Sequence, residues 1–297
     1  MIKGYHIQHI IKMMEQNNLD MLYAKDAVYC IKSKIAANYI NNSLFDDFTN
    51  NITKNMIADI DVMRIVDRKQ LSQCYKIIQK QINNQHMENG VTLIDPENTY
   101  IDYDVTIGMD SVIYPGVILS GNTSVGENVT LYPGCRIKNT IIGDNCVLQA
   151  VVSNGAQIGN DITIGPFVNI RPNTKIMNGC KIGDFVEIKN STIDEGTKVP
   201  HLTYVGDADV GKKVNIGCGT VFVNYDGYRK HRTTVGDNVF IGCNTNLVAP
   251  VCVENDTYTA AGSTITDDVK QGSIAIARAR QVNKEGWVEK YRKKNEK

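Results

Sequence analysis

The sequence lacks the features that mark several common protein classes. It has no CxxC cysteine pair, no apolar run long enough to cross a membrane, and no excess of either charge. The 32 basic residues equal the 32 acidic ones, so nothing in the composition favours binding to nucleic acid or to an anionic membrane. The eight cysteines are scattered, which favours a reducing compartment over a disulfide framework. We therefore expect a cytoplasmic protein with neither nucleic acid nor membrane as a partner.

Nucleotide-binding and metal-binding motifs are also missing from the first third of the chain. Residues 1–95 contain no glycine-rich phosphate loop, and His6 and His9 have no third ligand beside them, so no metal site is expected there. The hydrophobic spacing predicts three helices, at residues 7–16, 24–39 and 68–85. We predict that residues 1–95 are an N-terminal helical region and linker, with packing or oligomerisation as its simplest role.

What the sequence has in abundance is a repeat of six residues. The aliphatic positions form three runs: Ile107, Ile113, Leu119, Val125, Leu131, Ile137; Ile158, Ile164, Ile170, Ile176, Ile182, Ile188; and Val235, Ile241, Leu247, Val253. A helix repeats at three and four and an isolated strand at two, so a period of six indicates a triangular coil with one inward aliphatic residue per side. Residues 96–270 are therefore predicted to form a parallel β-helix of roughly nine coils, followed by a C-terminal tail at 271–297.

Two departures from the regular repeat point to a binding site. The interval between Phe222 and Val235 is lengthened by residues 224–232, which read NYDGYRKHR and carry the aromatic, amide and basic groups that a phosphorylated ligand requires. Extra loops on repeat proteins often bind ligands. In addition, Arg171 and Lys189 are 18 residues apart, one full coil, so both should point from the same edge of adjacent coils.

Several motifs resemble those of one enzyme family. They are EIKN at 187–190, PHLTYVGD at 200–207, VNIG at 214–217, NYDG at 224–227, NLVAP at 246–250 and KEGW at 284–287. Together they resemble the acetyltransferase half of the bacterial bifunctional N-acetylglucosamine-1-phosphate uridyltransferase/glucosamine-1-phosphate N-acetyltransferases, which belong to the hexapeptide-repeat transferases. The resemblance implies a mainly β fold, a left-handed parallel β-helix with an N-terminal α-helical region. The first 65 residues are too few for the family's nucleotide-binding domain, so UTP-dependent activity is not expected.

The resemblance also implies a reaction and the residues that perform it. A homotrimer would transfer acetyl from acetyl-CoA to the amine of glucosamine-1-phosphate, for UDP-GlcNAc and cell-wall synthesis, and would need no metal. His201 matches the base that deprotonates the amine, a task that suits the imidazole pKa, and Glu187 matches the carboxylate that orients the ring. The positions matching sugar-phosphate ligands are Arg171, Lys189, Tyr204, Asn215 and Lys230. The positions matching acetyl-CoA contacts are Cys218, Asn224, Tyr225, Cys243, Ala261 and Arg278, with Lys284 as a further cation.

Three other functions stay open at this point. A β-helical carbonic anhydrase needs three zinc-binding histidines, whereas the repeats contain only His201 and His231. A non-catalytic scaffold that binds sugar phosphates would keep the cationic residues without turnover. An acetyltransferase acting on another amino sugar would share the whole residue set.

Overall fold

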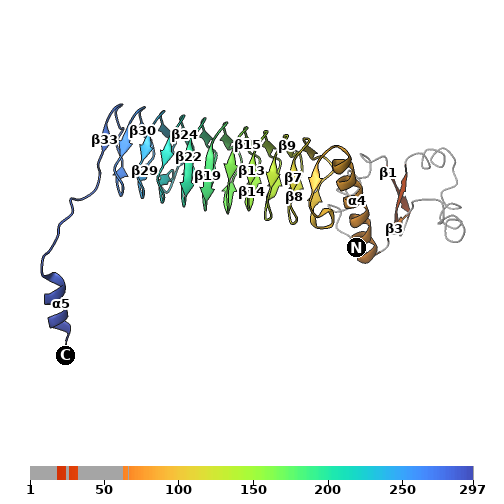
Figure 1. Cartoon of the computed structure of the whole chain (residues 1–297), viewed down its shortest axis with the longest axis horizontal. Helices are drawn as coiled ribbons and strands as arrows, with labels where there is room; N and C mark the ends of the chain where they lie inside the picture. Colours follow the sequence, from red (N-terminus) through yellow and green to blue (C-terminus); the bar gives the residue numbers. More distant parts are fainter. Residues whose placement is uncertain (1–18, 25–26, 33–62, 66, 297) are drawn as a thin grey trace, which may run out of the picture.

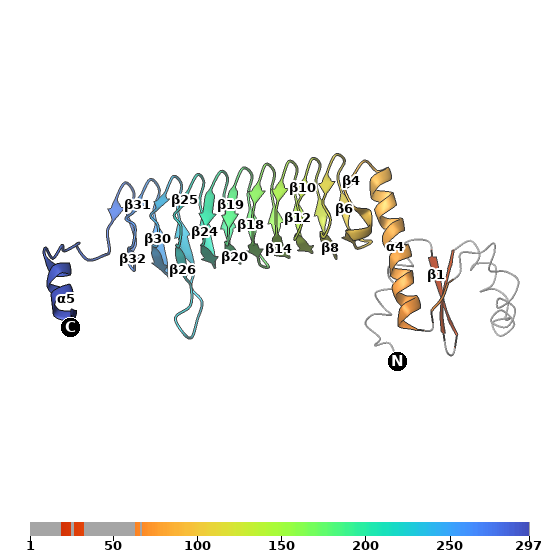
Figure 2. The ribbon, with the colours of Figure 1, turned by 60° about the horizontal axis from the view of Figure 1, so that its bottom comes forward.

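The computed structural model describes residues 19–24, 27–32, 63–65 and 67–296. Its dominant feature is a prism of stacked parallel strands that extends from Thr92 to Ala275 (Figures 1 and 2). The three sides are sheets of eleven, ten and nine strands, so the stack has about ten coils. The predicted mainly β fold, a parallel β-helix, is confirmed.

Each side of the prism is one sheet whose neighbouring strands come from successive coils. The first sheet contains β4 (Thr92–Leu93), β7 (Val112–Ile113), β10 (Thr130–Leu131), β13 (Val147–Leu148), β16 (Thr163–Ile164), β19 (Lys181–Asp184), β22 (Lys198–His201), β25 (Asn215–Ile216), β28 (Phe240–Ile241), β31 (Tyr258–Thr259) and β33 (Ile274–Ala275). The second contains β5 (Tyr100–Ile101), β8 (Ile118–Ser120), β11 (Arg136–Lys138), β14 (Val151–Asn154), β17 (Val168–Ile170), β20 (Glu187–Lys189), β23 (Tyr204–Gly206), β26 (Val221–Val223), β29 (Asn246–Val248) and β32 (Thr264–Ile265). The third contains β6 (Thr106–Ile107), β9 (Ser124–Val125), β12 (Ile141–Ile142), β15 (Gln157–Ile158), β18 (Lys175–Ile176), β21 (Thr192–Ile193), β24 (Ala208–Val210), β27 (Thr233–Val235) and β30 (Val251–Val253).

The core is built from the aliphatic residues of the six-residue repeat. Ile164, Ile182 and Val199 pair in register on neighbouring strands of the first sheet, and each is at most 1% exposed. Burying one such side chain contributes about 1.5–3 kcal/mol relative to leaving it exposed. Because the same inward position is filled in nearly every coil, the prism has a continuous apolar axis rather than a single central cluster.

The prism extends beyond the predicted limits of 96–270 at both ends. Its first strand begins at Thr92 and its last ends at Ala275. The short 3-10 helix η1 (Pro96–Asn98) lengthens the first coil, and the last coil is also irregular, so neither keeps the six-residue spacing. The division into domains at these positions remains a prediction.

Helix α4 (Arg68–Glu88) covers the N-terminal end of the prism, as predicted for residues 68–85 (Figure 1). The side chain of Asp67 caps it by accepting a hydrogen bond from the Gln70 backbone N–H at 2.7 Å. Ile78 and Ile82 are 3% exposed and belong to the same core cluster as the coils. This helix therefore closes an end that would otherwise leave apolar side chains in water.

The sheet β1 (Leu19–Ala24), β2 (Ala27–Lys32) and β3 (Met63–Ile65) is antiparallel and corrects one helix prediction. Residues 27–32 were expected within a helix at 24–39 but form a strand. The sequence AVYCIK is rich in β-branched and aromatic residues, and so short an apolar run does not distinguish helix from strand by periodicity. The helix predicted at 7–16, together with His6 and His9, lies outside the described residues.

Beyond β33 the chain leads to α5 (Trp287–Asn295), none of whose residues is buried. Its last turn carries Arg292, Lys293 and Lys294. Within the part of the chain that the structure describes, no helix combines the length and the apolar character needed to span a bilayer.

Candidate active site

One corner of the prism carries four of the predicted site residues, including the predicted base, in a single row. Asp184 pairs with His201 across β19 and β22, and the pairing of Lys198 with Asn215 places Cys218 beside His201 on the next coil. The Asn244 N–H donates to the Cys218 carbonyl at 2.7 Å, which fixes Cys243 one coil further on. Successive coils therefore place at this corner, in order, Asp184, His201, Cys218, Cys243 and Ala261.

His201 forms a hydrogen-bonded pair with Asp184 at this corner. The His201 Nδ1 atom bonds to Asp184 Oδ1, and this contact lowers the pKa of Asp184 below its ordinary value. The two coils are close here because residue 183 is glycine: a Cβ there would lie 1.7 Å from the Pro200 carbonyl oxygen. With Nδ1 engaged, the Nε2 atom is the ring nitrogen left for a ligand, since no described residue bonds to it.

No hydrogen bond among the described residues joins Glu187 to His201, so the orienting role expected of Glu187 stays a prediction. Glu187 instead accepts hydrogen bonds from Arg171 Nη1 at 3.0 Å and from Asn169 Nδ2 at 3.4 Å. Residues at the same place in adjacent coils here are 17 apart, so Asp184 faces His201, whereas Glu187 pairs with Tyr204 on the second sheet.

A second polar centre lies where the lengthened loop meets β20 and β23. The Asn224 Nδ2 atom donates to Asp207 Oδ2 and, at 3.3 Å, to the hydroxyl of Tyr204. Lys189 Nζ lies 3.8 Å from the same Asp207 oxygen. A hydrogen bond and charge repulsion from the Lys189 ammonium lower the pKa of Lys230. Two ammonium groups held this close form a site that favours an anion between or beside them.

Asp207, to which sequence reasoning gave no role, organises this centre. It is buried, and Asn190 Nδ2 donates to its other oxygen at 2.5 Å. Burial acts to raise the pKa of Asp207, but hydrogen bonds from Asn190 and Asn224 and the charge of Lys189 lower it on balance. A buried carboxylate therefore holds the lysine and the two amides in place. Its position as the last residue of the PHLTYVGD motif was the only signal in the sequence.

The loop after β26 is a small hairpin that projects from the prism (Figure 2). Tyr225 and Lys230 form an antiparallel bridge across it. Asp226 accepts hydrogen bonds from the backbone N–H groups of Tyr228 and Arg229 at 2.7 and 2.6 Å and from His231 Nε2 at 2.7 Å. These contacts lower the pKa of Asp226 to about 2. The hairpin thus fixes the backbone that presents Lys230 to Lys189.

Arg232, which sequence reasoning did not single out, anchors the end of this hairpin. Its Nε and Nη2 atoms donate to the two carboxylate oxygens of Asp209 at 2.5 and 2.6 Å. It also donates to the backbone carbonyls of Asn190 and Ala208, each at 3.1 Å. A bidentate contact of this kind has a fixed geometry, so it sets the point at which the chain rejoins the third sheet.

The remaining predicted residues lie around these centres without all joining them. Asn215 points outward from the first sheet in register with Lys198. No hydrogen bond among the described residues links it to the second polar centre, which contains Lys189 and Lys230 and is called the lysine centre below. Arg171 lies one coil from Lys189, as the spacing predicted, but it is paired with Glu187. The Arg278 side chain reaches the turn after Ala261. Its Cδ lies 3.7 Å from the point that a Cβ would occupy if residue 262 were not glycine. Tyr225 is 56% exposed on the hairpin.

The histidines give no support to a zinc enzyme. His201 and His231 each face a single aspartate, Asp184 and Asp226. In the described part of the chain, no group of three or more histidine, cysteine or acidic residues has the proximity that a metal ion would require.

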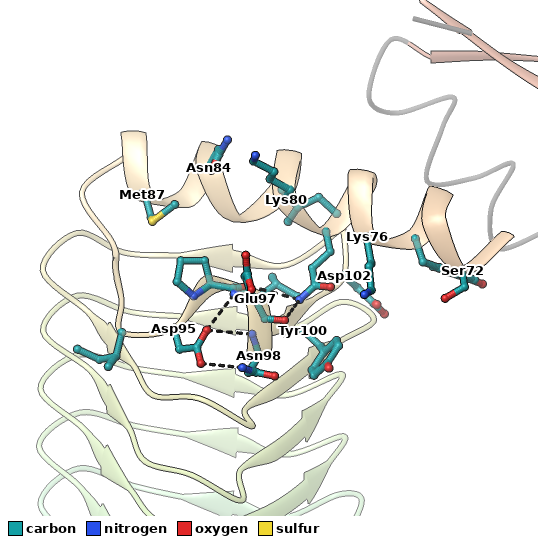
Figure 3. A pocket seen from close by; sticks show the side chains of 16 residues that line it. Ser72, Lys76, Lys80, Asn84, Met87, Asp95, Glu97, Asn98, Tyr100 and Asp102 are labelled. Atoms are coloured by element: carbon teal, nitrogen blue, oxygen red, sulfur yellow. Dashed lines mark hydrogen bonds between the residues drawn. The ribbon is translucent and has the colours of Figure 1, made fainter. Parts of the chain in front are cut away.

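A groove of about 1180 Å³ lies at the opposite end of the prism, between α4 and the first coils (Figure 3). Lys76 and Lys80 of the helix and Asp95, Glu97 and Asp102 of the first coil line it. None of the predicted site residues belongs to this groove. The candidate site is thus an open corner of the prism, separate from this groove.

Comparisons with known proteins show what this chain is similar to. Residues 155–190 match the model of the bacterial transferase hexapeptide (six repeats). Over 230 residues, 77% of this chain, the sequence is 56% identical to "Bifunctional protein GlmU" of Clostridium botulinum (strain Langeland) and 57% identical to that of Clostridium acetobutylicum. In each case the match covers 50% of the relative, so the chain spans about half the length of these curated relatives. Among solved structures, UDP-N-acetylglucosamine acyltransferase from Campylobacter jejuni aligns with 61% of this chain and 71% of its own, at 19% identity and a TM-score of 0.41.

The fold is a β-helix built from six-residue repeats, and residues 155–190 match the repeat model of bacterial hexapeptide transferases. The particular proteins to which this chain is similar are the bifunctional proteins GlmU. An aligned stretch of 230 residues in a chain of 297 has to include the central coils, with His201 and the lysine centre among them. The resemblance that the motifs indicated, to the β-helical acetyltransferase half of this enzyme, is confirmed.

Proposed function

We propose that this chain transfers the acetyl group of acetyl-CoA to the amine of glucosamine-1-phosphate. The observation that carries the proposal is the meeting of Lys189, Lys230 and Tyr204 beside the corner that holds the His201–Asp184 pair. A sugar phosphate needs a cationic site for its phosphate and, next to it, a base for its amine. The product, N-acetylglucosamine-1-phosphate, would serve UDP-GlcNAc and cell-wall synthesis, and the working form would be a cytoplasmic homotrimer.

In this mechanism His201 acts as the general base. Asp184 holds the proton on Nδ1, so that the lone pair of Nε2 can accept a proton from the substrate ammonium group. The free amine then attacks the thioester carbonyl. As the tetrahedral intermediate collapses, the nitrogen loses its second proton and CoA is expelled, leaving as the thiol once its sulfur has taken up a proton. A backbone N–H near Cys218 is the donor we would assign to the developing oxyanion.

The other predicted residues receive binding roles. Lys189 and Lys230 would bind the phosphate, with Tyr204 and Asn215 bonding to the phosphate and sugar. Arg171 would contribute by exchanging its contact with Glu187 for the ligand. Acetyl-CoA would lie along Asn224, Tyr225 and the corner formed by Cys218, Cys243 and Ala261. Arg278 would bind its phosphates.

A thiol-release assay with acetyl-CoA and glucosamine-1-phosphate tests the proposal. The pure chain should release CoA only when both substrates are present. His201→Ala should lower kcat by about 10²–10⁴, the usual contribution of a positioned base, while binding of the sugar phosphate largely survives. His86→Gln, a change on α4 far from the corner, serves as the control and should leave turnover intact. Unchanged turnover in His201→Ala would show that His201 is not the general base.

The same assay separates the alternative functions. Release of CoA only with a different amino sugar would keep the acetyltransferase and change its acceptor. Binding of the sugar phosphate without turnover by any acceptor would indicate a non-catalytic scaffold.

A further inference from the structure

The corner row contains two neighbouring thiols for which the proposed acetyl transfer has no chemical use. Cys218 is partly exposed and Cys243 is exposed, whereas Cys135, Cys146 and Cys180 are buried in the prism. Burial raises the pKa of Cys135 and of Cys180 to about 11, which keeps these two thiols protonated and unreactive. The two thiols of the row are thus accessible to solvent, whereas the thiols of the core are buried.

The register fixes the backbone separation of these two cysteines. Asn215 pairs with Phe240 and Ile216 with Ile241, so the turns that follow, with Cys218 and Cys243, lie side by side. The Gly217 N–H donates to the Ile241 carbonyl at 2.8 Å and the Asn244 N–H to the Cys218 carbonyl at 2.7 Å, so the ladder is intact on both sides of the pair. Neighbouring parallel strands are about 4.8 Å apart, which lies within the Cα separation of roughly 4.4–6.8 Å that a disulfide spans.

The residue on the other side of Cys218 is His201, one coil earlier in the row. Cys252 offers a contrast, because it is also partly exposed but lies on the third sheet, away from this row. Accessibility and a partner at disulfide distance therefore coincide only at Cys218 and Cys243 among the cysteines whose side chains the structure describes.

We propose that Cys218 and Cys243 are an oxidation site that closes to a reversible disulfide and shuts the corner to acetyl-CoA. A peroxide is the oxidant. The thiolate of one cysteine attacks the peroxide O–O bond, giving a sulfenic acid and water, and the second thiolate then displaces the hydroxyl group, which leaves as water. Both sulfurs are oxidised and hydrogen peroxide is reduced to two waters. The effect on acetyl-CoA rests on the proposed function, whereas formation of the disulfide does not.

Peptide mapping of the full chain after treatment with hydrogen peroxide tests the site. Trypsin releases Cys218 in peptide 214–229 and Cys243, together with Cys252, in peptide 233–270. Under non-reducing conditions the two peptides should be joined, with the loss of two hydrogens, in a protein that still runs as a single chain. The link should persist in Cys252→Ser, the matched control, and disappear in Cys218→Ser and in Cys243→Ser.

Three results would overturn the proposal: over-oxidation of Cys243 to the sulfinic acid without a link, a link that requires Cys252, or a link between two chains. Acetyl-CoA binding, measured by calorimetry, should be lost on oxidation and restored by dithiothreitol, and the same should hold in Cys252→Ser. If reduced protein forms the link but never transfers acetyl, the oxidation site stands and the proposed function fails.

Discussion

Two aspartates to which sequence reasoning gave no role determine where the polar groups of the candidate site lie. Asp184 holds His201, and Asp207 holds Lys189 and Asn224. Neither assignment follows from chemistry alone, because Glu187 offers the same carboxylate only three residues from Asp184. The coil spacing separates the two candidates, and it favours the residue in register with the histidine.

Asp184→Asn tests the positioning role of this carboxylate. We expect kcat to fall by roughly ten- to a hundredfold, a part of the 10²–10⁴ that base catalysis contributes, with KM nearly unchanged. Asparagine keeps the shape but loses the charge that stabilises the imidazolium ion. Steady-state kinetics of Asp184→Asn measures this change, and Glu187→Gln is the comparison variant. If Glu187→Gln lost kcat in this way and Asp184→Asn did not, the assignment would be reversed.

The pH dependence of the His201–Asp184 pair follows from the lowered pKa of Asp184. A carboxyl whose pKa is lower in the folded state contributes stability above its ordinary value of about 3.9 and loses it as pH falls through the lowered value. We therefore expect the Asp184 carboxyl carbon, followed by NMR, to titrate at a lower pH in the wild type than in His201→Gln. Equal midpoints in the two proteins would show that the contact is not formed in solution.

At the scale of elements, the hairpin at 224–232 and helix α4 have different roles. The hairpin is held by one carboxylate, Asp226, and by Arg232 at its end. Its packing therefore adds little to the core, and its function is to place Lys230. Helix α4 buries Cys74, Ile78 and Ile82 on the first coil and closes the prism.

Asp226→Ala should loosen the hairpin without unfolding the prism. The backbone N–H groups of Tyr228 and Arg229 lose their acceptor, so hydrogen exchange at these amides should become faster. KM for the sugar phosphate should rise more than kcat falls, because Lys230 is no longer held beside Lys189. In the wild type these contacts are complete above the ordinary aspartate pKa and are lost as pH falls toward about 2. Unaltered exchange at both amides would refute the proposed role of Asp226.

Two adjacent isoleucines of α4 provide a matched test of the cap. Ile78 is 3% exposed and Ile77 is 50% exposed. Ile78→Ala should lower the free energy of unfolding by about 2–5 kcal/mol, because it opens a cavity against the first coil. Ile77→Ala should change it by less than about 0.5 kcal/mol. Denaturant titration of both variants measures the difference, and equal losses would show that the helix does not pack as described.

On the scale of the whole molecule, the prism presents an apolar ladder next to the candidate site. Phe167, Phe185 and Leu202 occupy equivalent corner positions of three successive coils, and each is 55–61% exposed. The rings of Phe167 and Phe185 stack at 5.3 Å between centroids, and all three residues have positive φ values between 45° and 58°. Bulky side chains with this backbone are costly, and exposed apolar patches commonly mark interfaces.

We expect the chain to assemble as a homotrimer that covers this ladder. Sedimentation equilibrium should give about three times the chain mass of 33.0 kDa. Phe185→Asp should shift the assembly toward monomer, because a charge would be buried against an apolar partner surface. Tyr228→Asp, on the projecting hairpin at a residue that is 93% exposed, is the control. A monomer in the wild type at assay concentration would exclude the trimer.

The sequence by itself determined the prism, the reaction class suggested by its motifs, and the one-coil relation between Arg171 and Lys189. It could do so because the β-helix is a one-dimensional repeat, in which a fixed interval along the chain becomes a fixed position in space. Only the tertiary structure decided the partners within the site: Asp184 for His201, Asp207 for Lys189, Glu187 for Arg171, and the neighbouring thiols Cys218 and Cys243. These contacts depend on coils shortened from 18 to 17 residues and on a hairpin inserted into one coil, and each such change shifts which side chains face each other.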